Sequence, residues 1–153
     1  MIKKVVVILF LTLFGSSSFA AEQSLDLDLA KQVLFETNRI MSAKSGEMIY
    51  HPNEVLAFNI IYRTSNAENT FKEVYQYSKS AGKFYALIGL FLKKDKDFEK
   101  LKTEFLNSKQ ELVYCQYGCK ASTDNDVKQV LNTWLAGIPK GLWYSQIVLS
   151  EKQ

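Results

Sequence analysis

The sequence predicts a mainly α-helical domain, a compact bundle or a short αα-superhelix of about six helices. Residues 80–92 begin with Ser80, a residue type that caps helices, and are then apolar on every side, which is typical of a helix enclosed by its neighbours. As a helix this stretch is about 20 Å long, too short to cross a bilayer. Residues 127–135 carry apolar side chains at i, i+3, i+4, i+7 and i+8, the stripe of an amphipathic helix. We therefore expect 80–92 to be the central helix.

Helical spacing of apolar residues predicts three further helices along the chain. The first runs from residue 25 to about residue 42. Pro52 is well placed to begin a second, which continues to about Arg63. Residues 95–107 form an amphipathic helix that follows the central one after a short polar turn. The pair is expected to make an αα-hairpin.

Capping signals mark the remaining boundaries. Residues 65–68 and 123–126 are capping boxes, each predicted to begin a helix, and Gly137 followed by Pro139 ends the second of these. Residues 111–117 are rich in Val, Tyr and Cys, so we expect an extended segment or short strand there. The tail, residues 141–149, has spacing compatible with one more short helix or with a strand.

The first twenty residues have the pattern of an export signal. Lys3 and Lys4 form a basic region and residues 5–14 are apolar. Residues 15–20 are mostly small, with Ser18 and Ala20 at the positions that precede a cleavage site. We expect cleavage between Ala20 and Ala21 and a periplasmic or secreted product with no stable membrane anchor.

The expected mature chain, residues 21–153, is nearly neutral and suits one domain. The leader removes two lysines and no acidic residue, so Lys+Arg falls from 19 to 17 against 16 Asp+Glu, and the formal charge falls from +3 to +1. Nucleic-acid binding depends on neutralising phosphates with a basic surface. The composition therefore argues against a nucleic-acid partner.

Both cysteines, Cys115 and Cys119, lie in the mature chain. In an oxidising compartment two cysteines most simply form one disulfide, and Gly118 between them can supply a tight turn. The spacing is one residue longer than the C-x-x-C redox motif and lacks its βαβ context. A structural bridge is therefore preferred over a redox role.

No catalytic or metal-binding motif is complete. His51 is the single histidine, and no G-x-S-x-G elbow surrounds a serine. One histidine and two cysteines that are expected to be bridged do not make a standard zinc site. Acidic pairs occur at predicted helix starts, where capping and the helix dipole explain them. We expect no cofactor and no metal.

Four aromatic residues late in the sequence are the candidate partner-binding residues: Tyr114, Tyr117, Trp143 and Tyr144. Tyr and Trp combine a large contact area with a polar tip and are enriched at binding hot spots. The alternative is that these side chains pack inside the domain. Trp134 lies in the regular stripe and is expected in the core.

These observations favour an exported, non-catalytic protein that binds another protein in the cell envelope. Its concrete form would be an inhibitor or immunity-type factor against an envelope-acting toxin or enzyme. Two alternatives remain open. One is a small envelope hydrolase that uses a carboxylate pair. The other is a carrier of an apolar ligand held between helices.

Overall fold

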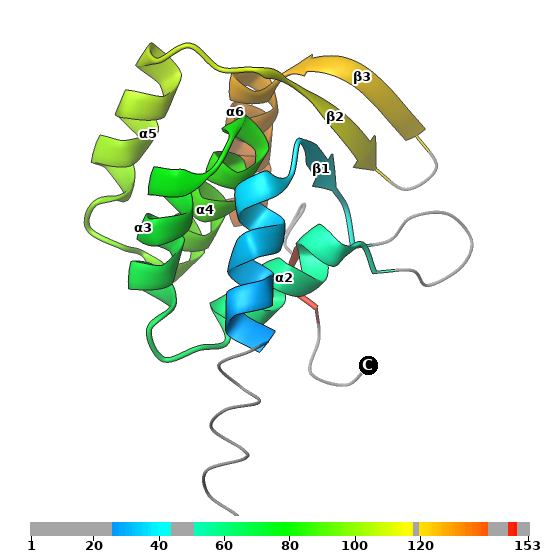
Figure 1. Ribbon diagram of the computed structural model, residues 1–153. Helices are drawn as coiled ribbons and strands as arrows, with labels where there is room; N and C mark the ends of the chain where they lie inside the picture. The colour runs from blue at the N-terminus through cyan, green and yellow to red at the C-terminus, as the bar shows by residue number, and fades with distance from the viewer. Residues whose placement is uncertain (1–25, 44–50, 118–119, 141–146, 150–153) are drawn as a thin grey trace, which may run out of the picture.

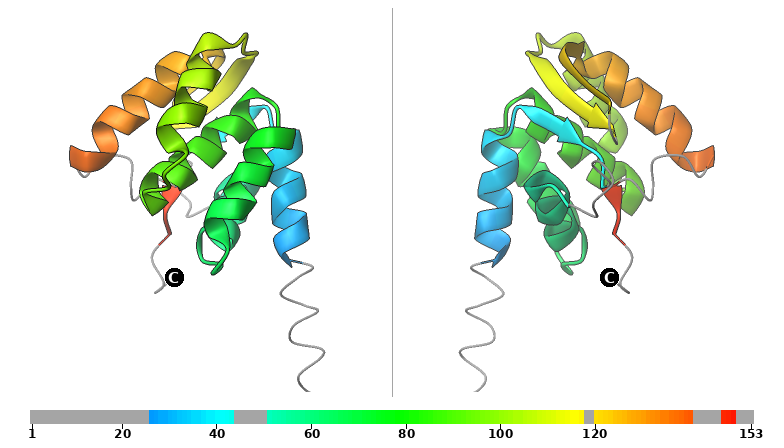
Figure 2. Two further views of the ribbon diagram at one scale, coloured as in Figure 1. Left: turned by 90° about the vertical axis from the view of Figure 1, so that its left-hand side faces the viewer. Right: turned by 90° about the vertical axis from the view of Figure 1, so that its right-hand side faces the viewer.

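Helix α4 (Ser80–Lys93) is the central element, as its sequence predicts. The computed structural model describes residues 26–43, 51–117, 120–140 and 147–149. Within these, α4 is buried on nearly every face and is contacted by α2, α3, α5 and α6. Figure 2 shows α6 and the N-terminal helix on opposite sides of the molecule. The mainly α-helical prediction is confirmed.

The helices follow the predicted order. Their bounds are residues 26–36 for the described part of the N-terminal helix, Asn53–Tyr62 for α2, Ala67–Tyr77 for α3, Phe98–Asn107 for α5, Val127–Gly137 for α6 and Ile138–Lys140 for the 3₁₀ turn η1. Helices α4 and α5 form the predicted hairpin around Lys94, which adopts the left-handed conformation that ends a helix. The predicted signal peptide and residues 141–146 of the predicted tail element lie outside the described residues.

The first predicted helix is too long. The helical residues end at 36, and β1 (Arg39–Met41) follows. The hydroxyl of Thr37 accepts a hydrogen bond from the backbone N–H of Arg39, at 3.1 Å, and so stabilises the turn between them. The apolar residues Ile40 and Met41 extend the predicted helix because a strand this short has no periodicity of its own that would distinguish it from a helix end.

A small mixed sheet joins a strand near the start of the described chain to a hairpin far from it in the sequence. Its order is β1-β2-β3, with β1 parallel to β2 (Leu112–Tyr117) and β2 antiparallel to β3 (Lys120–Asp126). The predicted extended segment at 111–117 is therefore confirmed as β2. The assignment of 123–126 to a capping box is wrong for most of its length, because these residues belong to β3, where Asn125 and Asp126 pair with Val113 and Leu112 of β2. Only Asp126 caps α6, accepting a hydrogen bond from the N–H of Lys128 at 2.9 Å.

Two glycines allow close packing of α4. A Cβ on Gly89 would overlap the ring of Phe71 on α3, and one on Gly82 would overlap the backbone carbonyl of Leu34 in the N-terminal helix. Both positions therefore require the absence of a side chain. Glycine within a helix lowers helix stability by about 1 kcal/mol relative to alanine. The close packing that the two glycines allow therefore offsets a loss in helix propensity.

Gly89→Ala is expected to lower the free energy of unfolding by about 1–3 kcal/mol, because overpacking outweighs the gain in helix propensity. Urea denaturation followed by circular dichroism measures the change. In the double variant Gly89→Ala/Phe71→Leu the loss should be smaller than the sum of the two single losses. Additive losses would contradict the contact between the Cβ and the ring.

Candidate functional site

Three of the predicted site residues lie on β2, and the structure separates them. Tyr117 contacts α6, where its ring centroid lies 6.0 Å from that of Trp134. Tyr114 packs instead against a second small cluster that contains Met41 and Val55. The two tyrosines therefore do not form one continuous surface. Cys119, Trp143 and Tyr144 lie outside the described residues.

The hydroxyl of Tyr117 is held by hydrogen bonds to two neighbouring side chains. The indole N–H of Trp134 donates to the Tyr117 hydroxyl, which also hydrogen-bonds the thiol of Cys115. Burial, followed by the bond to Cys115, raises the pKa of Tyr117 far above its ordinary value, and burial raises the pKa of the Cys115 thiol. All three groups are therefore uncharged at neutral pH.

Cys115 is a free, buried thiol in the structure. Its predicted disulfide partner, Cys119, lies outside the described residues, so the bridge stays a prediction. The two cysteines flank the end of β2, where Tyr117 pairs with Lys120 across the hairpin.

The first groove, which we call the hairpin groove, lies between the β2–β3 hairpin and α6. Its volume is about 260 Å³, enough for a side chain, and its lining residues are Tyr117, Asn125, Asp126, Gln129, Val130, Thr133 and Trp134. The amide of Asn125 donates to the carbonyls of Val113 and Ser122, at 3.1 and 2.9 Å, which holds the wall in place. The groove thus combines aromatic rings with fixed polar groups.

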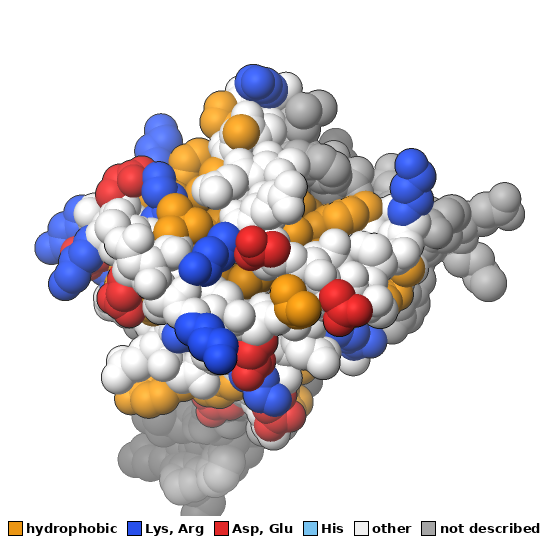
Figure 3. All heavy atoms as spheres, turned by 90° about the horizontal axis from the view of Figure 1, so that it is seen from above, with side chains coloured by type: hydrophobic (Ala, Val, Ile, Leu, Met, Phe, Trp, Pro, Cys, Tyr) orange, Lys and Arg blue, Asp and Glu red, His pale blue; other side chains and the backbone are white. Residues whose placement is uncertain are grey.

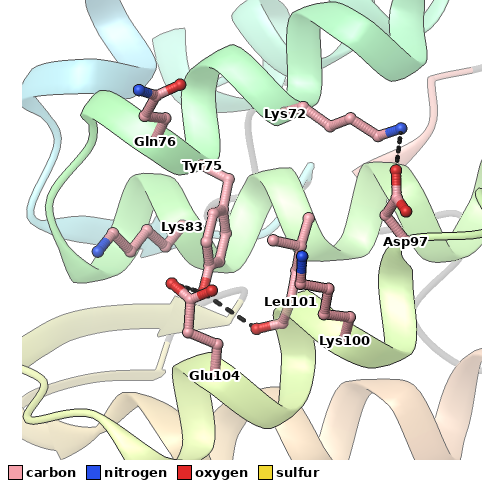
Figure 4. A pocket seen from close by; sticks show the side chains of 8 residues that line it. All are labelled: Lys72, Tyr75, Gln76, Lys83, Asp97, Lys100, Leu101 and Glu104. Atoms are coloured by element: carbon pink, nitrogen blue, oxygen red, sulfur yellow. Dashed lines mark hydrogen bonds and ion pairs between the residues drawn. The ribbon is translucent and has the colours of Figure 1, made fainter.

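The second groove, the α3–α5 groove, lies over α4 and has a volume of about 420 Å³ (Figure 4). At one end Lys72 bridges Asp95 and Asp97, with Nζ–O distances of 3.0 and 2.7 Å. At the other end the ammonium of Lys83 lies 5.5 Å from the centroid of the Tyr75 ring. The groove therefore carries charges of both signs, and those at the first end are already paired.

Tyr75 links the walls of the α3–α5 groove. Its hydroxyl donates to the carbonyl of Leu101 at 3.0 Å and lies 3.4 Å from Glu104, as the dashed lines in Figure 4 show. Burial, with the nearby charge of Glu104 as a second cause, raises the pKa of Tyr75 to about 12. Tyr75 is therefore a neutral hydrogen-bond donor at physiological pH.

Charges are mixed over the surface seen from above. Lysine and arginine side chains alternate with aspartate and glutamate, with hydrophobic side chains between them (Figure 3). Within the described ranges, no group of three or more His, Cys, Asp and Glu residues is arranged to hold a metal ion. Over the same ranges, no helix has the length and apolar character needed to span a membrane.

Two buried polar residues of α2 were missed by the sequence reasoning. Glu54 is buried and pairs with Arg39 of β1, at 2.7 Å, and also accepts a hydrogen bond from Thr37 at 3.2 Å. Asn59 is buried among apolar neighbours. A polar residue inside an otherwise apolar helical run is the signal that could have identified Asn59, because such a residue needs a specific partner. Glu54 gives no such signal, because it lies in the first turn of α2, where acidic residues are common.

Comparison of the chain with protein-family models, curated proteins and solved structures finds no match. The geometry of the two grooves and the sequence pattern are therefore the features from which a function can be inferred.

Tyr75→Phe tests the hydrogen bonds of the α3–α5 groove. At pH 7 we expect a loss of about 1 kcal/mol in the free energy of unfolding, because the Leu101 carbonyl loses its donor. The folded-state pKa of about 12 exceeds the ordinary 10.0, so the unfolded chain releases this proton first and stability falls as the pH rises from 10 to 12.

The phenylalanine variant lacks that proton and should show a shallower fall over the same range. Urea midpoints measured at several pH values between 8 and 12 would detect the difference. Parallel curves for the two proteins would contradict the raised pKa.

Proposed function

We propose that this is an exported, non-catalytic protein that binds another protein in the cell envelope through the hairpin groove. The proposal rests on the position of Tyr117. This half-buried aromatic side chain lines the hairpin groove and is held by its contacts with Trp134 and Cys115. In its specific form, the protein is an inhibitor or immunity-type factor against an envelope-acting toxin or enzyme. The β2–β3 hairpin extends from the helices in Figure 1, which supports its use as the contact element.

Preorganisation supports this choice of surface. The ring of Tyr117 packs on Trp134, and its hydroxyl is held by Cys115 and Trp134. Ordering a free side chain on binding costs about 0.5–1.5 kcal/mol, and a side chain that is already fixed avoids most of that cost. A disulfide between Cys115 and Cys119 would restrain the hairpin end further.

The helices that support this surface form, in our proposal, a compact bundle around α4 or a short superhelix. The contacts of α4 with α2, α3, α5 and α6 support the bundle.

Neither alternative gains support from the two grooves. For a hydrolase, the acidic residues that line them have partners: Asp97 pairs with Lys72, Glu104 lies 3.4 Å from the hydroxyl of Tyr75, and Asp126 caps α6. For a carrier of an apolar ligand, the grooves have mostly polar or charged linings rather than Phe and Leu. Protein binding therefore remains the preferred function.

Tyr117→Ala should weaken binding to the envelope partner by about 2 kcal/mol or more, as expected for an aromatic hot spot. The measurement is capture from envelope extract with the tagged chain, followed by titration of the captured protein. Tyr77→Ala is the matched control, because Tyr77 is 64% exposed on α3 and lines neither groove. Equal affinity of the two folded variants would exclude the hairpin groove.

Export predicts a mature N-terminus at Ala21. Mass spectrometry of the chain recovered from the envelope fraction should show the loss of residues 1–20. Ala20→Arg should block cleavage, because the position before the scissile bond requires a small residue. An intact N-terminus on the unaltered protein would contradict the export signal.

A further inference from the structure

The polar side chains of the hairpin groove define what kind of group it can hold. They come from the three elements that wall the groove: Tyr117 from β2, Asn125 and Asp126 from the end of β3, and Gln129 with Thr133 from one side of α6. Each side chain has a fixed number of hydrogen-bond donors and acceptors. The chemistry of an occupant therefore follows from the donors and acceptors that the fold leaves unused.

The fold uses most of the donors of these side chains internally. Asn125 donates both amide protons to backbone carbonyls within the hairpin. The hydroxyl of Thr133 donates to a backbone carbonyl one turn earlier in α6, at 2.9 Å. Trp134 donates its indole N–H to Tyr117. Among the lining side chains that the structure describes, the exposed amide of Gln129 is the one that keeps donors for a ligand.

Acceptors, in contrast, remain on both walls. Asp126 is exposed, accepts the N–H of Lys128 with one carboxylate oxygen at 2.9 Å, and makes no ion pair with any described residue. The oxygens of Asn125 and Thr133 each keep a lone pair after the bonds that they make. Asp126 is also the single charged side chain among the described lining residues. The groove therefore offers one negative charge and several acceptors.

The ring of Tyr117 adds an aromatic surface to these acceptors. It is half-buried, lines the groove and packs on Trp134 with ring centroids 6.0 Å apart. Aromatic faces attract cations, and a guanidinium also stacks on the ring because it is planar. A guanidinium carries five N–H donors and no acceptor. Its charge, shape and hydrogen-bonding groups are therefore complementary to those of the groove.

The α3–α5 groove has the opposite excess of charge. Three lysines line it, Lys72, Lys83 and Lys100, against two acidic residues (Figure 4). The ammonium of Lys83 already lies over the ring of Tyr75, 5.5 Å from its centroid. A cationic side chain is therefore expected to select the hairpin groove over this one.

We propose that the hairpin groove binds an arginine side chain presented by the partner protein. The guanidinium stacks on the ring of Tyr117 and donates to the second carboxylate oxygen of Asp126. Its other N–H groups are then available to the oxygens of Asn125 and Thr133. This inference rests on the function proposed above, because it names the group that the partner inserts into the same groove.

The test uses the full chain and three small probes, N-acetyl-arginine amide and its lysine and citrulline counterparts, followed by two-dimensional NMR. Citrulline keeps the length and planarity of arginine but is uncharged. We expect the arginine probe to shift the backbone amide signals of Gln129 and Thr133, with a dissociation constant on the order of millimolar. Lysine and citrulline should bind about tenfold more weakly. Equal affinity for arginine and citrulline, or shifts centred on the α3–α5 groove, would overturn the proposal.

Asp126→Asn tests the carboxylate without removing the helix cap, because asparagine caps helices as well as aspartate does. Binding of the arginine probe should weaken about tenfold in this variant. Asp124→Asn is the matched control. It removes the same charge from an exposed position of β3 outside the groove lining, and asparagine tolerates the positive φ of 59° found there. Binding should be unchanged in the control, and equal weakening in both variants contradicts the proposed contact.

The captured partner separates this inference from the function on which it rests. Partner binding that is weakened about tenfold by Asp126→Asn, and not by Asp124→Asn, supports both. If Tyr117→Ala weakens partner binding and Asp126→Asn does not, the groove is the interface but holds no cation, so the inference fails and the proposed function stands. If no partner is captured while the arginine probe binds as described, the chemistry of the groove is supported and the protein-binding function is not.

Discussion

The close packing of α3 on α4 is the constraint on which the rest of the structure depends. Gly89 lets the ring of Phe71 lie against the backbone of α4. Phe71 in turn contacts Phe58 of α2, with ring centroids 5.2 Å apart, and Phe58 contacts Tyr85 at 6.3 Å. These three aromatic rings therefore connect α3, α2 and α4. The ring of Phe71 can take its position only because Gly89 has no side chain.

The same helix positions both the sheet and the hairpin groove. The buried hydroxyl of Tyr85 accepts a hydrogen bond from the backbone N–H of Met41 at 2.8 Å, which fixes β1 to the core. Phe84, the preceding residue, meets Trp134 edge-on at 5.3 Å. Trp134 in turn contacts Tyr117. The position of Tyr117 in the hairpin groove therefore depends on the packing of Trp134 against α4.

The sequence predicted those elements whose signal lies within the element itself. Residues 80–92 and 127–135 have apolar patterns that need no partner to be recognised, and β2 is marked by its Val, Tyr and Cys content. Strands β1 and β3 have no such signal. β1 is three residues long and reads as the end of a helix, while β3 is mostly polar and exposed and exists through its pairing with β2.

The candidate site was predicted only in part for the same reason. Residue type predicts Tyr117 as a binding residue, but its contact with Trp134 depends on how α6 packs against β2, which spacing along the chain does not reveal. The buried amide of Asn59 likewise has a hydrogen-bond partner far from it in the chain, the carbonyl of Ile147. Spacing along one helix cannot reveal such a contact.

The parallel pairing of β1 with β2 has a consequence for how the chain folds. Ile40 pairs with Cys115, so the sheet closes a loop that contains α2, α3, α4 and α5. Closing a long loop costs chain entropy before its contacts form, whereas neighbouring helices can associate through local contacts. We therefore expect the helices to assemble first and the sheet to be completed late. Until β1 docks, the edge of β2 beside Cys115 is unpaired, so we expect thiol reagents to reach this cysteine more easily in the helical intermediate than in the folded protein, where it is buried.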